Sequence, residues 1–349
     1  MMKHPFLEVV EEDIAVKRAS VPTSDEQVAE TQHHHSVPWN LDRLDQHENK
    51  LDGQYEPEGD GRLASIYIID TGVRYTHHEF EGRAHYPGFD AIDKLTGTDR
   101  KGQDCHGHGT HCAGTAAGKT YGVAKKATIY SLRALGCDGT GAVSGIVEAM
   151  DYIVKKVDSS SDGSPTVFSL SLGVRESRSL NAAVKRAMDK GIVAVGAAGN
   201  QGGDSCHYSP ASARVGIAVG STDEDDNMVS FSNAGSCTDI YAPGTSIKSA
   251  TSACDTCTKT LSGTSMSAPH VAGYMAIILS LHPQLTAHQA KEKMISQATK
   301  DKVGLAAISS SLAARTPNRL LYIPQAVAQD SDMYQTARIN SFSDALGRP

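Results

Sequence analysis

Short apolar runs alternate with Ala-rich segments of helical periodicity between residues 38 and 323. The apolar runs cover residues 66–69, 128–132, 166–172, 192–197 and 215–219. The helical segments cover residues 108–117, 143–155, 179–188 and 266–281. Strands that are apolar along their whole length are typical of a parallel sheet covered on both faces. The alternation predicts an α/β fold in one domain, with a doubly wound, mostly parallel sheet and helices on both faces.

Polar segments flank this region on both sides. Residues 1–37 are charged and end in His33, His34 and His35, which we interpret as a polar linker rather than a metal-binding tract. Residues 324–349 form a polar tail with little apolar periodicity. We therefore expect the domain to span residues 38–323. The first 16 residues carry acids where a signal peptide needs an apolar run, which by itself favours a cytosolic protein.

The composition excludes some classes of partner. Hydrophobic residues make up 39% of the 349, enough for a sizeable core. Asp and Glu number 40 against 33 Lys and Arg, which gives a formal net charge of -7. A non-specific nucleic-acid binder needs a basic face, so nucleic acid is not an expected partner. A membrane-spanning helix needs an apolar run of about 18 residues, and the sequence has none, so no membrane partner is expected.

Three polar side chains stand where an apolar run meets a Gly-rich turn. Asp70 ends the first apolar run, His108 opens the first helical segment, and Ser265 precedes the last one. Taken singly, such residues are ordinary turn and cap residues. Together they supply an acid, a base and a nucleophile. A Ser hydroxyl becomes nucleophilic when an imidazole takes its proton, and a carboxylate orients that imidazole.

The segments around these residues carry a family resemblance. They read IIDTGV at 68–73, GHGTHCAGT at 107–115 and SGTSMSAPH at 262–270. They resemble the Asp, His and Ser signatures of the subtilase family of serine peptidases, particularly its proteinase K and aqualysin branch. The likeness runs from about residue 38 to residue 322, and the chain order Asp, His, Ser is that of subtilisin. The α/β-hydrolase fold is disfavoured, because its G-x-S-x-G elbow needs Gly where Ser267 stands.

The resemblance implies a serine endopeptidase that hydrolyses peptide bonds through a Ser acyl-enzyme. Asp70 resembles the orienting acid, His108 the general base and Ser265 the nucleophile. The stretch ending at Asn200 resembles the oxyanion segment, so its side-chain amide and the Ser265 backbone N–H are the expected oxyanion donors. Without the resemblance, Asn200 reads as a turn residue. His106, His111 and His270 are not expected to be catalytic, and the last two are interpreted as packing histidines.

A polypeptide substrate is expected to bind as an added strand between two edges of the chain. By resemblance, these edges are formed by Gly139, Gly141, Ser171, Leu172 and Gly173. The main side-chain pocket is expected to be lined by Ala197, Ala198 and Gly199, whose small size leaves room for an apolar or aromatic side chain. We also expect a monomer.

The seven cysteines change the expected location of the protein. The resemblance implies the disulfides Cys105–Cys137 and Cys206–Cys237, and it matches Cys112 to a buried free thiol. Cys254 and Cys257 are compatible with a small local bridge or with a redox or metal half-site. Two bridges imply an oxidising compartment, so the protein is expected to be extracellular or in the secretory pathway.

Catalysis is not expected to need a cofactor, but the resemblance implies a structural calcium ion. Its expected ligands are Asp223 and the main-chain carbonyls of Arg214 and Gly216. The alternative is a solvated acidic turn, because residues 223–226 form a charge run.

The N-terminal segment implies a precursor. Residues 5–13 resemble the last strand of a subtilase propeptide, which acts as an inhibitor of the enzyme. We interpret residues 1–37 as the remnant of a propeptide C-terminus with its linker. The rest of the propeptide and any signal peptide are missing, so we expect the sequence to be a fragment or a variant. Little active enzyme is then expected when the chain is expressed without a propeptide.

Two rival functions remain. The first is a catalytically silent binding module on the subtilase fold, although all four expected catalytic positions are filled. The second is a metal hydrolase, because His106, His108 and His111 resemble an H-x-H-x-D-H zinc motif. Thr110 stands where that motif needs Asp, which disfavours the second rival.

Overall fold

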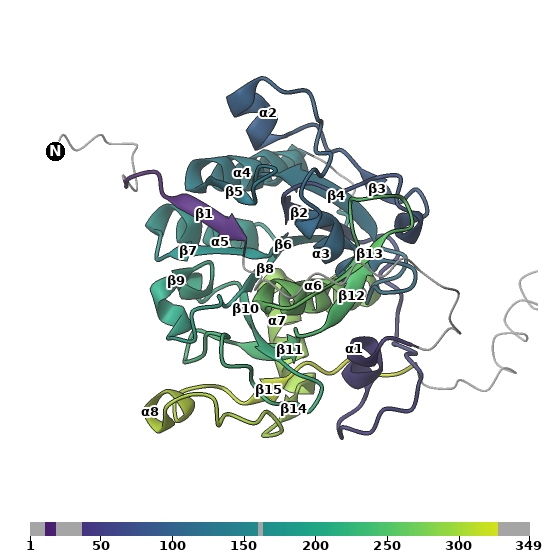
Figure 1. Cartoon of the computed structure of the whole chain (residues 1–349), viewed down its shortest axis with the longest axis vertical. Helices are drawn as coiled ribbons and strands as arrows, with labels where there is room; N and C mark the ends of the chain where they lie inside the picture. The colour runs from purple at the N-terminus through teal and green to yellow at the C-terminus, as the bar shows by residue number, and fades with distance from the viewer. Residues whose placement is uncertain (1–10, 19–36, 160–162, 327–349) are drawn as a thin grey trace, which may run out of the picture.

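The computed structural model describes residues 11–18, 37–159 and 163–326. At its centre lies a nine-stranded sheet in the order β14–β15–β11–β10–β8–β6–β2–β4–β3 (Figure 1). Its strands are β2 (Ser65–Asp70), β3 (Ala84–His85), β4 (Thr128–Arg133), β6 (Thr166–Leu170), β8 (Val193–Ala197), β10 (Ile217–Thr222), β11 (Ile240–Pro243), β14 (Thr299–Lys300) and β15 (Arg319–Leu320). Neighbouring strands run parallel except for the β14–β15 pair. The predicted mostly parallel α/β sheet is confirmed.

Helices cover both sides of this sheet. They are α1 (Trp39–Asp42), α2 (Ala91–Thr96), α3 (His108–Ala117), α4 (Val143–Ser159), α5 (Arg178–Asp189), α6 (Thr264–Leu281), α7 (Ala287–Gln297) and α8 (Ser310–Ala313). The pair α3 and α6 and the pair α4 and α5 lie on opposite sides of the strands (Figure 1). In the described part of the chain, no helix combines the length and apolarity that crossing a membrane requires.

Helix α6 is the central helix of the core. It is apolar on all sides, and its residues from Thr264 to Leu279 are buried. It begins at Thr264, two residues before the predicted helical segment 266–281. Pro269 lies in its second turn, and the N–H that proline lacks leaves the carbonyl of Ser265 without its helical partner.

One predicted strand divides into two. The apolar run 166–172 forms β6, which stays in the central sheet, and then β7 (Leu172–Arg175), which leaves it. The break falls at Ser171, whose side chain and carbonyl both bond to Ser265. At this position, hydrogen bonds to Ser265 take the place of the bonds that would pair a continuous strand with its neighbours.

Strand β7 belongs to a second, antiparallel sheet in the order β5–β1–β7–β9. Its other strands are β1 (Ala15–Arg18), β5 (Thr140–Ala142) and β9 (Tyr208–Ser209). In Figure 1, the N-terminal strand β1 lies between β5 and β7. A hairpin of β12 (Ile247–Ala250) and β13 (Thr258–Leu261) completes the strands.

Candidate active site

Asp70 and His108 meet where β2 ends and α3 begins. Asp70 Oδ1 and His108 Nδ1 are 2.7 Å apart, and both side chains are fully buried. The approach depends on Gly109, because a Cβ at that position would lie 2.2 Å from the carbonyl oxygen of Gly72. Only glycine lets the start of α3 lie this close to the turn after β2.

The charge of Asp70 sets the acid–base properties of His108. Burial disfavours the charged imidazole, but the adjacent carboxylate outweighs it and raises the pKa of His108 well above its usual value. The other ring nitrogen, Nε2, is buried and has no hydrogen-bond partner among the described residues. The pair thus presents an oriented imidazole with one nitrogen available to take a proton.

Asp104 connects the two segments that carry this pair. Its Oδ1 accepts hydrogen bonds from Thr71 Oγ1 at 3.0 Å and from the backbone N–H groups of His106 and Gly107 at 2.8 and 2.9 Å. Its Oδ2 accepts from the N–H and the hydroxyl of Thr110 at 3.0 and 2.6 Å. One carboxylate therefore holds the turn after Asp70 and the first turn of α3 together.

Ser265 is the second residue of α6 and is buried. Its hydroxyl donates to the carbonyl of Ser171 at 3.0 Å, and the Ser171 hydroxyl donates back to the Ser265 carbonyl at 2.9 Å. That carbonyl is available because Pro269 has no N–H to donate to it. The Cys112 thiol also contacts it at 3.5 Å and lies 3.9 Å from His108 Nδ1, so Cys112 bridges the two residues.

The side-chain amide of Asn200 has a fixed orientation. Its oxygen accepts from the N–H of Thr264 at 3.0 Å and from the Thr264 hydroxyl at 2.7 Å. Its nitrogen, Nδ2, is buried and meets no acceptor within the described part of the chain. Gly199 precedes it with a φ of 102°, and a Cβ there would lie 2.4 Å from Asn233 Nδ2. An unpaired amide beside the start of α6 is suited to receive a negatively charged oxygen.

The neighbouring histidines have other surroundings. His111 Nε2 donates to the carbonyls of Ile247 and Lys259, both at 3.0 Å, and burial lowers the pKa of His111 to about 3. His270 donates to the carbonyl of Met266 at 2.7 Å and accepts from Asn40, and burial lowers the pKa of His270 to about 4. Both are neutral packing histidines, as predicted. His106 is half-buried, and desolvation lowers the pKa of its ring.

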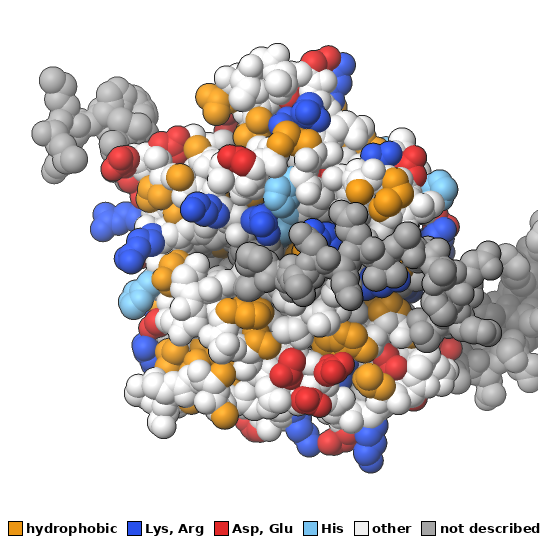
Figure 2. Space-filling view, in the orientation of Figure 1, with side chains coloured by type: hydrophobic (Ala, Val, Ile, Leu, Met, Phe, Trp, Pro, Cys, Tyr) orange, Lys and Arg blue, Asp and Glu red, His pale blue; other side chains and the backbone are white. Residues whose placement is uncertain are grey.

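The two expected substrate edges flank strand β1. Lys17 lies opposite Thr140 of β5 and Gly173 of β7, and Arg18 lies opposite Leu172. A cavity beside β1 is lined by Ala197, Ala198 and Gly199 together with Gly173, Tyr208 and Ser209. On the face in Figure 2, Lys and Arg side chains gather beside β1. The chain's own N-terminal strand thus lies where a substrate strand was expected.

The expected propeptide strand at residues 5–13 stays a prediction, because residues 5–10 lie outside the described residues. The described strand β1 comprises Ala15–Arg18, within the segment 1–37 that we interpret as a propeptide remnant. Val16 at its centre is fully buried. His33–His35 and the tail from residue 327 also lie outside the described residues.

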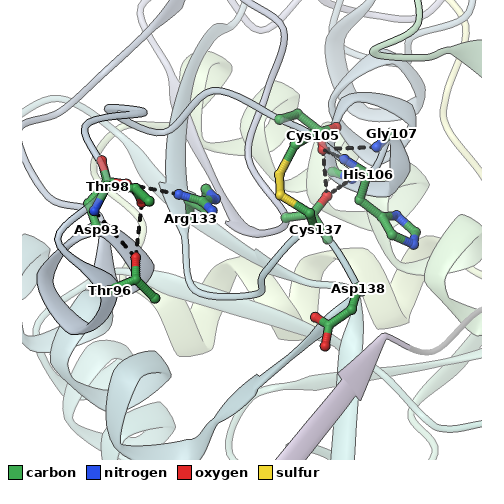
Figure 3. Close-up of a disulfide and its surroundings, with 12 residues drawn as sticks. Asp93, Thr96, Thr98, Cys105, His106, Gly107, Arg133, Cys137 and Asp138 are labelled. Carbon is green, nitrogen blue, oxygen red and sulfur yellow. Dashed lines mark hydrogen bonds and ion pairs between the residues drawn. A yellow bond between two sulfur atoms is a disulfide. The ribbon is translucent and has the colours of Figure 1, made fainter.

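Three disulfides are present. Cys105–Cys137 and Cys206–Cys237 form as expected, Cys254 pairs with Cys257, and Cys112 is a free, buried thiol. Figure 3 shows that Cys105–Cys137 ties the segment before α3 to the segment after β4. His106 and Asp138 flank this bridge on the side of β1 (Figure 3).

The sequence profile of the subtilase family (peptidase S8) matches residues 61–315. The chain belongs to the subtilase family. It is 41% identical over 286 residues to the extracellular serine proteinase of Thermus sp. (strain Rt41A), covering 82% of this chain and 66% of that one. It is 42% identical over 265 residues to the alkaline serine exoprotease A of Vibrio alginolyticus, covering 76% of this chain and 47% of that one.

A solved structure of a subtilase agrees with this assignment. The crystal structure of a cold adapted subtilisin-like serine proteinase matches with a TM-score of 0.75 and 41% identity, covering 84% of this chain and all of that one. The chain spans 66% and 47% of the length of the two curated relatives. The fold and the family of the chain follow from these matches.

The expected calcium ligands do not come together in this subtilase. The carbonyls of Arg214 and Gly216 both accept hydrogen bonds from the ammonium of Lys291, at 3.0 and 2.5 Å. The carboxylate beside them is Asp239, whose Oδ1 lies 2.9 Å from Lys291 Nζ. Asp223 instead accepts from the N–H groups of Asp225 and Asn227 within its own turn. The residues present do not fit the expected metal ion, and no step is routed through one.

Several residues of the site were missed from the sequence. The role of Asp104 was only weakly indicated by the sequence: it stands four residues before His108, the first residue of α3, where an Asp can accept hydrogen bonds from the start of the helix. Thr264 gave none, because its role depends on a loop 64 residues away in the chain. The Ser171 hydroxyl and Lys291 likewise act through contacts that only the folded chain creates.

Proposed function

We propose that this subtilase is a serine endopeptidase that hydrolyses peptide bonds of proteins through an acyl-enzyme. Ser265 attacks the substrate carbonyl, and His108 takes its proton and passes it to the leaving amine. Asp70 holds the His108 ring and stabilises its charged form. The Asn200 amide and the Ser265 backbone N–H receive the oxyanion of the tetrahedral intermediate.

One observation carries this proposal: two polar groups in the site are buried without partners. His108 Nε2 lacks a hydrogen-bond partner within the described ranges, and so does Asn200 Nδ2. Buried polar groups are normally paired, and leaving one unpaired costs about 1–3 kcal/mol. A proton acceptor and an oxyanion donor, each fixed through its other atom, are what acyl transfer needs.

The nucleophile needs one local rearrangement. Ser265 Oγ donates to the Ser171 carbonyl, whereas attack requires the hydroxyl to turn its proton to His108 Nε2. Catalytic hydrogen bonds are often misaligned before substrate binds. A substrate strand that uses the Ser171 carbonyl as an acceptor would release the Ser265 hydroxyl for this turn.

Strand β1 supports an inhibitory role for the N-terminal segment. It pairs with both edges expected to bind substrate, and the Asp13 carboxylate accepts hydrogen bonds from the N–H and the hydroxyl of Ser144. Glu11 accepts from Ser177, Ser179 and the N–H of Arg178. A segment held this way excludes a substrate strand until it is removed. The disulfides and a relative described as extracellular add support for a secreted zymogen.

Cleavage of a peptide library by the folded chain, with a subtilase propeptide supplied during refolding, tests the proposal. Wild type should cut internal peptide bonds, and Ser265→Ala should not. Ser267→Ala, a buried serine on the same helix, is the matched control and should retain cleavage. Correctly folded wild type without cleavage would favour the silent binding module.

A further inference from the structure

The ammonium of Lys291 lies inside a small cluster of oxygen atoms. Lys291 is on α7 and only 8% exposed. Its Nζ donates to the carbonyls of Arg214 and Gly216 at 3.0 and 2.5 Å and lies 2.9 Å from Asp239 Oδ1. An ammonium has three N–H donors, and here each has an oxygen partner.

The surrounding backbone is arranged for a cation. Arg214 has a φ of 59°, a left-handed conformation that is uncommon for a residue other than glycine. In this conformation its carbonyl and that of Gly216 reach the same ammonium. The second oxygen of Asp239 accepts from the N–H of Ala218 at 2.9 Å, which fixes the carboxylate. Two carbonyls and a carboxylate are also the hard oxygen ligands that calcium prefers.

We propose that Lys291 is a tethered cation that replaces a metal ion at this corner of the fold. The ammonium supplies the positive charge that the oxygen cluster needs. The segment from Arg214 to Gly216 is therefore held in place without calcium. Removing the ammonium would leave a cluster of oxygen atoms that binds calcium.

The position of the cluster gives the cation a structural task. The Lys291 ammonium joins α7 to the residues just before β10 and to Asp239, just before β11. The segment before β10 begins at β9, which comprises Tyr208 and Ser209. Those two residues line the cavity beside β1. Burial raises the pKa of Asp239, and the Lys291 charge opposes that rise. This inference concerns stability and is independent of the catalytic proposal.

Thermal unfolding of the refolded full chain tests the inference, with calcium or a chelator present. Lys291→Met removes the charge but keeps a long apolar stem. Its Tm in chelator should fall by roughly 5–10 °C, because a buried charge loses its partner. Calcium should restore most of this loss. Wild type should show a smaller difference between calcium and chelator than the variant does.

Two further variants make the test specific. Lys291→Met/Asp239→Asn should lose the calcium rescue, because the carboxylate is gone. Lys302→Met, which breaks only an exposed ion pair with Glu48, is the control and should behave like wild type. Terbium luminescence gives a readout besides stability: Lys291→Met should bind one more ion per chain than wild type.

Each outcome of these measurements either supports or overturns the inference. If Lys291→Met does not fold in chelator, the refolding yield with and without calcium replaces the Tm, and rescue by calcium supports the inference. If the variant shows no additional bound ion and no calcium-dependent gain over wild type, the inference is overturned.

Discussion

Thr264 fixes Asn200 by offering both its backbone N–H and its hydroxyl to the amide oxygen, at 3.0 and 2.7 Å. The arrangement settles which end of the amide faces the site, because only the oxygen can accept two donors. The amide nitrogen is then left without a partner among the described residues, as the proposed oxyanion donor requires. The first residue of α6 thus orients a donor that lies on another segment.

Asn200→Ala should slow the chemical step without weakening substrate binding. Loss of one oxyanion donor lowers kcat by about 10²–10³-fold, because the donor acts mainly in the transition state. KM should change little. Steady-state kinetics on a peptide substrate measures both constants, and a rise in KM at unchanged kcat would contradict the assignment.

Thr264→Val is the companion variant. It removes the hydroxyl bond and keeps the backbone bond, so the amide should be less firmly held. We expect a smaller loss of kcat than for Asn200→Ala. The double variant should be no worse than Asn200→Ala alone, since Thr264 acts through the amide.

The pH dependence of activity should report the Asp70–His108 pair. His108 accepts a proton only when neutral, so kcat/KM should fall as the pH drops through the pKa of His108. Asp70 raises this pKa, so Asp70→Asn should move the acid limb to lower pH. The same variant should lower kcat by about 10⁴-fold, because the ring loses its orientation. An acid limb that stays in place after Asp70→Asn would contradict the assigned pair.

Asp104 is expected to be a positioning residue that acts through this pair. Asp104→Ala should lower kcat with little change in KM, because the turn after Asp70 and the start of α3 are no longer tied together. Thr286→Ala is the control, since Thr286 caps α7 through the N–H of Gln289 and touches neither segment of the pair. Both variants should lose stability by about 0.5–2 kcal/mol, as lost caps do. Equal kcat values for the two would count against a positioning role.

How much of this site was predictable depends on the range of each interaction. Asp70, His108 and Ser265 stand in local motifs, and helix α3 has the predicted bounds. The break at Ser171 was missed because it depends on bonds to Ser265, 94 residues away. The calcium ligands were wrong for a similar reason. Arg214 and Gly216 lie close in sequence to the acidic run at 223–226, but only the fold brings Lys291 and Asp239 to their carbonyls.

The N-terminal strand should inhibit the mature enzyme. A peptide of residues 11–18 should compete with substrate, because β1 pairs with both binding edges. The Val16→Asp peptide should inhibit more weakly, since the Val16 side chain is fully buried and a charge there is costly. Inhibition constants measure the difference. Equal inhibition by the two peptides would show that the register of β1 does not matter.

The register of β1 also predicts where the chain cuts itself. Arg18 lies opposite Leu172 in an antiparallel pair, so the next position of the N-terminal segment would lie opposite Ser171, which contacts Ser265. Self-cleavage should therefore occur at the first peptide bonds beyond Arg18. Mass spectrometry of the refolded chain should find the new N-terminus there, and Ser265→Ala should remain uncut. Cleavage that persists in Ser265→Ala would point to another enzyme.

The most direct test of the central claim is covalent labelling of the nucleophile. A fluorophosphonate probe reacts with a serine only where a base and an oxyanion site activate it. Peptide mapping of the refolded, mature protein should place the adduct on Ser265, and heat-denatured protein should stay unlabelled. Folded protein that takes no label, or takes it at another serine, would contradict the assignment of Asp70, His108 and Ser265 as the catalytic triad.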